Sequence, residues 1–159
     1  MSVAQVKAYL EQFGAADRVL EFPVSSATVE LAAAAVGTEP ARIAKTLSFL
    51  VGENCVLVVA AGDARIDNRK FKDYFHTKAK MPAPAQVLER VGHPVGGVCP
   101  FGVGEGVRIF LDVSLRRFTT VFPAAGSGNS AIELTPEELQ RFSRAEAWVD
   151  LCTLPAEAQ

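Results

Sequence analysis

Hydrophobic and polar positions along this chain follow two periods, which predict helices and strands. Apolar residues recur at helical spacing over 2–13, 25–37, 67–75 and 83–92, and capping residues or glycines bound these segments. Strand patterns cover 18–24, 46–51, 55–61, 107–115, 118–124, 131–134 and 147–151, and residues 135–139 read as a capped helical turn. Because helices and strands mix without a regular alternation, we expect an α+β fold around one mixed sheet.

One lysine interrupts this pattern in the segment "ARIAKTLSFL", residues 41–50. Thr38, Glu39 and Pro40 predict the start of a short helix that ends near Lys45, and an apolar strand follows. Lys45 therefore lies at a junction between elements, next to the core. Either its ammonium extends to solvent along the surface, or it forms part of a pocket.

Length and composition predict one domain over residues 1–159. The chain has 49% hydrophobic residues, a net charge of −2 and three widely separated cysteines, so neither a disulfide framework nor a CxxC metal site is suggested. The first residues hold no apolar segment typical of a signal peptide, and no run approaches the roughly 20 apolar residues of a membrane span. We expect a cytoplasmic protein without membrane contact.

Charge is distributed unevenly along the chain. Residues 65–80 hold six Lys or Arg against two Asp, whereas residues 133–159 hold six acids and two bases. A local basic patch can contact a phosphate backbone even when the whole molecule is acidic. The alternative is a solvated helix face.

A glycine-rich segment, "VGGVCPFGVGEG" at residues 95–106, separates a predicted helix from a strand. It is not a dinucleotide-binding loop, because Val107 stands where the last glycine of GxGxxG is needed and a strand follows instead of a helix. Gly96 and Gly97 would let backbone amides approach a ligand closely. A tight connection without function is the other interpretation.

Two further candidates come from loops. Cys99 is a possible nucleophile with His93 or His76 as base, but nothing in the sequence indicates a lowered thiol pKa. The loop "FPAAGSGNSAIEL" again places glycines and hydroxyl residues between strands. The two histidines and three cysteines lack the spacing of metal ligands, so we expect neither a metal nor another cofactor.

The order of these features resembles the YbaK and prolyl-tRNA synthetase associated domain family. The matching marks are the Ala-rich helix ending at Gly37, "ARIAKTL" with its lysine, "GGVCPFG" as Gly-Gly-x-x-Pro-x-Gly, Asp112 in the next strand, and "AAGSG" followed by "IEL". The resemblance covers nearly the whole chain. It implies a curved sheet flanked by helices and a free-standing hydrolase that removes a wrong amino acid from tRNA, usually tRNA for proline.

The resemblance also implies a site. Lys45 would be the catalytic residue, a cation that contacts the terminal ribose-phosphate or the developing oxyanion, since a lysine with its ordinary pKa is not a general base. The Gly96–Gly97 turn would offer amides to the substrate carbonyl. The other predicted substrate-binding residues are Phe22, Thr28, Leu47, Pro100, Gly102, Phe122, Gly126, Ser127 and Gly128. Arg69, Lys70 and Lys72 would contact tRNA near its 3′ end, and prolyl-tRNA synthetase is a candidate partner.

One position departs from the family pattern. The branch specific for alanine tends to have Val-His-Pro where this chain has Val121, Phe122 and Pro123. We therefore expect a small residue such as cysteine, serine or threonine as the target, with Thr28 or Ser127 contacting its polar group. Two rival functions are a tRNA- or synthetase-binding module without catalysis and a Cys99-dependent hydrolase of small esters.

Overall fold

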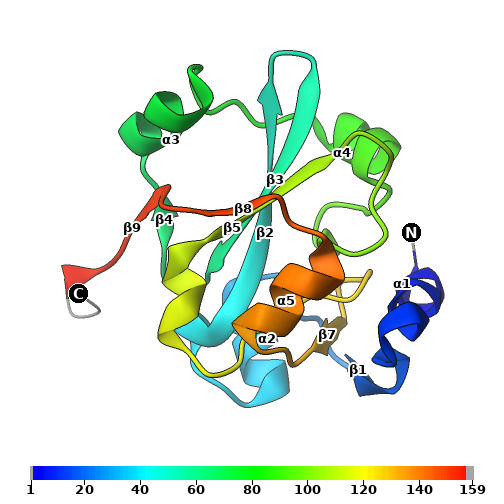
Figure 1. Ribbon diagram of the computed structural model, residues 1–159. Coiled ribbons are helices and arrows are strands. Elements are labelled where there is room, and N and C mark those ends of the chain that lie inside the picture. Colours follow the sequence, from blue (N-terminus) through cyan, green and yellow to red (C-terminus); the bar gives the residue numbers. More distant parts are fainter. Residues whose placement is uncertain (1, 157–159) are drawn as a thin grey trace.

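Two long antiparallel strands, β2 (Ile43–Val51) and β3 (Asn54–Ala61), form the central hairpin of the fold (Figure 1). The computed structural model describes residues 2–156, so the outermost residues of the predicted 1–159 domain lie outside the described range. β3 is apolar at nearly every position because both of its faces are covered, which explains its uninterrupted hydrophobic run.

The hairpin belongs to a mixed five-stranded sheet, and this confirms the predicted α+β class. The strand order is β6-β2-β3-β5-β8, with β5 (Arg108–Asp112), β6 (Phe122–Pro123) and β8 (Ala147–Val149) joined in parallel to their neighbours. Two small antiparallel pairs stand apart: β1 (Val19–Glu21) with β7 (Ser130–Ile132), and β4 (Arg65–Ile66) with β9 (Cys152–Thr153).

Within residues 2–156, five α-helices surround the sheet, and their ends follow local sequence signals. They are α1 (Val3–Leu10), α2 (Val29–Val36), α3 (Asn68–Phe75), α4 (Pro84–Val91) and α5 (Pro136–Ser143). Ser2, Thr28, Asp67 and Thr135 accept hydrogen bonds from backbone amides at the helix starts, as the sequence predicts. Gly37 and Gly92 end their helices in the left-handed region.

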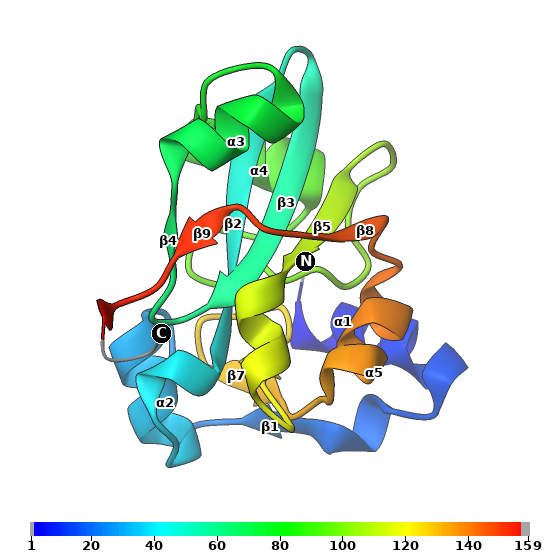
Figure 2. The same cartoon turned by 60° about the vertical axis from the view of Figure 1, so that its left-hand side comes forward.

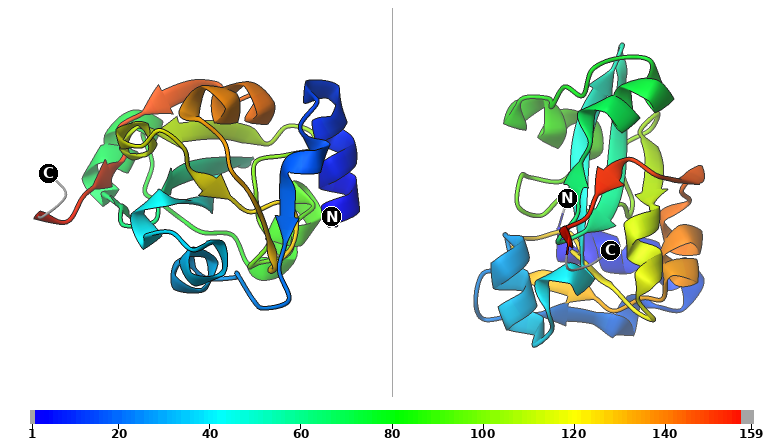
Figure 3. Two further views of the ribbon diagram at one scale, coloured as in Figure 1. Left: turned by 90° about the horizontal axis from the view of Figure 1, so that it is seen from below. Right: turned by 90° about the vertical axis from the view of Figure 1, so that its left-hand side faces the viewer.

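The alternation of side chains along the hairpin divides the core into two layers. Cys55, Leu57 and Val59 face a cluster that includes Val87 and Val91 of α4. Val56 and Val58 face the opposite layer, where Phe71 of α3 packs. α3 and α4 consequently lie on opposite sides of the hairpin, as Figures 1 and 3 show.

The structure corrects several predicted boundaries. The helix expected to end near Lys45 is a single 3-10 turn, η3 (Pro40–Arg42), capped by no side chain, and β2 already begins at Ile43. Lys45 is therefore the third residue of a strand, paired with Ala60, and does not stand at a junction. The strand predicted over 107–115 ends at Asp112 and continues as η4 (Val113–Arg117), because Asp112 accepts a hydrogen bond from the Ser114 amide.

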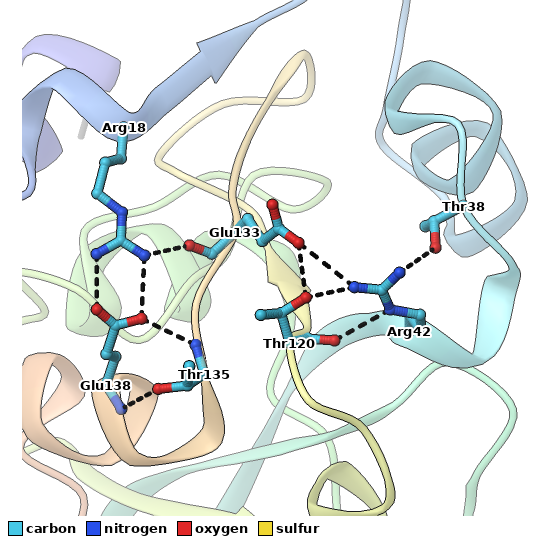
Figure 4. Close-up of polar contacts among 7 residues, drawn as sticks. All are labelled: Arg18, Thr38, Arg42, Thr120, Glu133, Thr135 and Glu138. Carbon is cyan, nitrogen blue, oxygen red and sulfur yellow. Dashed lines mark hydrogen bonds and ion pairs between the residues drawn. The ribbon is translucent and has the colours of Figure 1, made fainter.

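Two arginines connect segments that are distant in the sequence (Figure 4). Arg18, in η2 (Ala16–Arg18), contacts Glu138 in the first turn of α5 and the carbonyl of Glu133. Arg42 donates to the carbonyl and hydroxyl of Thr120 and contacts Glu133. Its guanidinium lies 5.2 Å from the ring centre of Phe122, so this network supports the strand that pairs with the start of β2.

None of the helices formed by residues 2–156 has the length and apolar character needed to cross a bilayer. In Figure 2 the chain from β8, at the edge of the sheet, to β9 passes in front of β3. β9 is an element that the hydrophobic pattern did not predict, because two residues are too few to show a period.

Candidate functional site

A cavity of about 510 Å³ lies along β2, between α2 and α4. Its walls come from residues 26–29, 43–48, 122, 124 and 130–131, from α4 with the loop before it, and from residues 95, 96 and 98 of the glycine-rich turn. Most of the lining is apolar, including Val29, Leu47 and Val87. A concave apolar site with few polar groups is typical of small-ligand binding.

Lys45 lines this cavity with a half-buried side chain. Its Nζ donates to the carbonyl of Gly62 at 3.3 Å and to the carbonyl of Ala64. Burial lowers the pKa of Lys45 below its usual value, while the charges of Cys152 and Asp63 act in the opposite direction. An ammonium has three N–H donors, so one remains after these two contacts.

The glycine-rich turn meets the cavity at Gly96 and not at Gly97. The Gly97 amide already donates to the Pro94 carbonyl at 2.9 Å, so it is not available to a substrate carbonyl as predicted. A Cβ on Gly97 would lie 2.9 Å from Cα of Ser127, which shows that this glycine is needed for close contact between two loops. No hydrogen bond within residues 2–156 involves the amide of Gly96.

The loop at 126–128 forms a layer behind the cavity wall. Gly126 packs against the start of α1, where a Cβ would lie 2.9 Å from the Ser2 carbonyl oxygen. Ser127 bonds through Oγ to Asn129 and Ser130. A Cβ on Gly128 would lie 3.7 Å from the Gly96 carbonyl oxygen, but none of these three loop residues lines the cavity.

The remaining predicted binding residues divide between the cavity and the structure around it. Thr28 and Phe122 line the cavity, although the Thr28 hydroxyl already caps α2 by accepting from the Leu31 amide. Phe22 hydrogen-bonds through its backbone to Asn129 and does not line the cavity. Pro100 and Gly102 line a separate hollow of about 190 Å³ beside Tyr9 and Arg144.

Two hydroxyl residues that the sequence reasoning missed line the same cavity: Ser26 and Thr46. Both hydroxyl oxygens are buried, and neither has a hydrogen-bond partner within the described part of the chain. Buried polar groups are nearly always paired in folded proteins, so two unpaired hydroxyls in one cavity point to a polar ligand group. Thr46 directly follows Lys45, which is the one signal that could have drawn attention to it.

The basic helix α3 presents only part of its charge to solvent. Lys70 donates to Asp150 at 3.0 Å and to the Cys152 carbonyl at 2.8 Å, so its ammonium holds α3 against the C-terminal segment. Arg69 and Lys72 are exposed, and their side chains have no partner among residues 2–156. These two residues remain candidates for contact with an anionic ligand.

The alternative nucleophile, Cys99, is fully buried beside His93, with 3.4 Å between Sγ and Nε2. Burial raises the pKa of Cys99 to about 12, and Cys99 does not line the cavity. A thiol that stays protonated and lies away from the cavity is a poor nucleophile. In residues 2–156 no three His, Cys, Asp or Glu side chains are grouped closely enough to hold a metal ion.

The fold and the cavity define a small α+β domain with a lysine on the wall of an apolar ligand site. Residues 24–142 match the model of a family described as the aminoacyl-tRNA editing domain. This match covers well over half of the sequence, and the chain therefore belongs to the aminoacyl-tRNA editing domain family.

Individual relatives agree with this assignment. The uncharacterized protein YwhH of Bacillus subtilis is 53% identical over 153 residues, which are 96% of this chain and 98% of that protein. A proline--tRNA ligase of Thermosipho melanesiensis is 29% identical over 125 residues, which are 78% of this chain but 22% of the ligase. A crystal structure of a protein described as a proposed trans-editing enzyme for prolyl tRNA synthetase superposes with a TM-score of 0.86 at 30% identity, covering 95% of this chain and 96% of that one.

Proposed function

We propose that this protein hydrolyses the ester bond between a non-cognate amino acid and the terminal ribose of a tRNA. The observation that carries this proposal is Lys45, which has one uncommitted N–H donor on the wall of an apolar cavity in a member of the editing-domain family. A cation at that position can stabilise the negative charge that grows on the ester oxygen.

The reaction needs only water as co-reactant. The water oxygen forms a bond to the ester carbonyl carbon, the bond from that carbon to the ribose oxygen breaks, and a proton from the water passes to the ribose oxygen. Lys45 serves as the charged contact of the substrate or its oxyanion, and the unused amide of Gly96, which lines the same cavity, is a further backbone donor. The Cys99 thiol has no part in this scheme.

The amino acid removed is a small one with a hydroxyl or thiol group, such as serine, threonine or cysteine. We expected Thr28 or Ser127 to contact that group, but both are already hydrogen-bonded within the protein. The unpaired hydroxyls of Ser26 and Thr46 are better placed, because both line the cavity. A polar substrate group supplies the hydrogen bonds that these hydroxyls lack.

The tRNA is the one for proline, and prolyl-tRNA synthetase is the candidate protein partner. Support comes from the relatives that are proline--tRNA ligases and from the solved structure described as a proposed trans-editing enzyme for that synthetase. The exposed side chains of Arg69 and Lys72 contact the phosphate backbone near the 3′ end. Lys78 and Lys80, which are exposed in the segment leading to the cavity residue Met81, extend this basic surface.

The test is to measure ester loss from tRNA for proline carrying Ala, Cys, Ser, Thr or Pro at equal concentrations. We expect the Ser, Thr or Cys ester to be lost fastest, relative to its hydrolysis in buffer. A preference for Ala would overturn the proposed specificity and leave the deacylase activity standing. Binding without loss of any ester would instead favour a tRNA- or synthetase-binding module.

A further inference from the structure

The strand β2 has an open edge inside the cavity. β3 pairs with it along one side, from Ala44 to Val51. On the other side β6 pairs only with Ile43 and Ala44, and the next contact is the hydrogen bond from the Leu50 amide to the Lys80 carbonyl at 2.7 Å. Within the described part of the chain, residues 45–49 therefore have no neighbouring strand on that side.

The direction of the open backbone groups follows from the ladder. In an antiparallel pair, alternate residues direct both N–H and C=O toward the partner strand, and the residues between them direct both groups away. The Leu50 amide points away from β3, because it donates to Lys80. Ser48 and Thr46, two and four residues earlier, present their N–H and C=O on that same side, and both line the cavity.

These backbone groups have no partner among residues 2–156. Pro82 lines the same cavity, but proline has no N–H with which to pair the edge. Unpaired backbone groups in an apolar cavity carry a free-energy cost unless a ligand or water pairs them. The edge thus adds backbone donors and acceptors to the Lys45 ammonium and the Ser26 and Thr46 hydroxyls in a mostly apolar site.

The length of the open edge limits what can pair with it. Five residues span about 16 Å at 3.3 Å per residue, and the pairing with Pro123 and Lys80 closes the two ends. A long strand from another protein does not fit between these ends. One amino acid residue does, because it needs only one edge residue to exchange two hydrogen bonds.

We propose that the open edge of β2 binds the aminoacyl group of the substrate as a strand of one residue. The α-ammonium donates to a carbonyl of Thr46 or Ser48, and the ester carbonyl accepts from an edge N–H. Lys45, the neighbour of Thr46 in the chain, is then next to the ester. This inference rests on the proposed function, and it adds that the protein recognises the α-ammonium, which every aminoacyl ester shares.

The first test changes the substrate. The seryl ester of tRNA for proline is compared with its α-hydroxy counterpart, the glyceroyl ester derived from glyceric acid, each relative to its own hydrolysis in buffer. Loss of the charged donor should reduce the acceleration by about tenfold to a hundredfold. Equal acceleration of both esters would overturn edge recognition while the deacylase function stands.

A binding measurement separates failure of this inference from failure of the proposed function. Titration calorimetry requires no turnover. It compares two non-hydrolysable 3′-amide analogues of the tRNA end, one carrying a seryl group and one a glyceroyl group. We expect the seryl analogue to bind at least about tenfold tighter. If no ester is cleaved but this difference is found, the edge inference holds and the hydrolase proposal fails; equal affinities overturn the edge inference in either case.

The second test changes the protein. Ser48→Pro removes one edge N–H and places a ring in the gap, without removing a hydrogen bond to β3. We expect turnover to fall at least about tenfold in a protein that still unfolds cooperatively. Asn68→Pro is the matched control, because Asn68 is exposed at the first position of α3, where proline is tolerated. A folded Ser48→Pro variant with normal turnover would contradict the proposal, and if it does not fold, the substrate tests decide.

Discussion

At the scale of single residues, Lys45 lies within a strand and not at the junction between a helix and a strand that its sequence neighbours predict. It belongs to a central strand, its stem is half buried, and two backbone carbonyls hold its ammonium. Burial lowers its pKa, so the fold makes the cation less stable than in water, and an anionic group beside it would restore that stability. This is the physical reason to assign Lys45 to binding a developing negative charge.

Replacing Lys45 by alanine should lower deacylation about a hundredfold, because one charged donor at a developing oxyanion is lost. Single-turnover ester loss measures this change. Lys7→Ala is the control, since Lys7 is an exposed lysine on α1 that pairs with Glu21. If the Lys45→Ala enzyme is folded and fully active, Lys45 is only a surface lysine with a buried stem.

The hydroxyls of Ser26 and Thr46 should affect specificity more than general activity. In Ser26→Ala and Thr46→Val we expect the preference for a seryl over an alanyl ester to fall about tenfold each, because the substrate hydroxyl loses a partner. The measurement is the ratio of kcat/KM for the two esters. The matched control is Ser25→Ala, a neighbouring exposed serine that does not line the cavity; an equal fall in both esters would contradict the assignment.

At the scale of elements, the contact between two glycine-rich loops decides the shape of the cavity wall. Gly97 lies so close to the backbone of Ser127 that a side chain must separate the loops. The glycine thus acts through packing, since its amide is already bonded to Pro94.

Gly97→Val should accordingly lower both the melting temperature and turnover. Gly106→Ala is the comparison variant: nothing lies near its Cβ, so its left-handed φ of 82° can lower stability, but turnover should stay normal because no loop is displaced. Thermal unfolding and ester loss are compared for both variants. Normal stability and turnover in Gly97→Val would mean that the loops are free to separate.

The network of Arg18 and Glu138 gives a prediction for acid stability. The hydrogen bond from Arg18 lowers the pKa of Glu138 from 4.5 to about 2. The stabilisation is therefore fully present above about pH 4.5 and is lost as the pH falls toward 2. In Glu138→Gln the free energy of unfolding should depend less on pH in that window; an identical pH profile by denaturant titration would show that the pair adds nothing.

At the scale of the whole molecule, an acidic protein has a basic stretch of chain, residues 69–80, that runs from α3 on one side of the hairpin to the cavity residue Met81. The net charge is −2, yet Arg69 and Lys72 on α3 and Lys78 and Lys80 in the following segment are all exposed. Lys70 is excluded from this surface because it binds Asp150. Such an arrangement directs a polyanion toward one side of the molecule.

The double variant Arg69→Ala/Lys72→Ala should bind tRNA more weakly and with a flatter salt dependence. Each lost phosphate contact removes roughly 0.7 to 0.9 from the slope of log affinity against log salt. Lys7→Ala/Arg141→Ala removes the same charge elsewhere and should leave the slope unchanged. An unchanged slope in the first variant would make α3 a solvated face.

The sequence by itself determined the features that depend on neighbours within a few residues. Capping of α1 by Ser2, of α3 by Asp67 and of α5 by Thr135 was predictable, because each cap bonds within its own first turn. The apolar run of β3 was equally clear. The order of Lys45 and the Gly-Gly-x-x-Pro-x-Gly turn also indicated the family that the comparison confirms.

Only the tertiary structure decided which of these groups are available for chemistry. Thr28, Gly97 and Lys70 were predicted to meet the substrate, but the Thr28 oxygen caps α2, the Gly97 amide donates to Pro94, and the Lys70 ammonium holds Asp150 and the Cys152 carbonyl. Ser26, Thr46 and the edge of β2 are unpaired because segments far away in the sequence bury them without supplying partners. Pairing and burial depend on distant segments meeting, and no local pattern in the chain records that meeting.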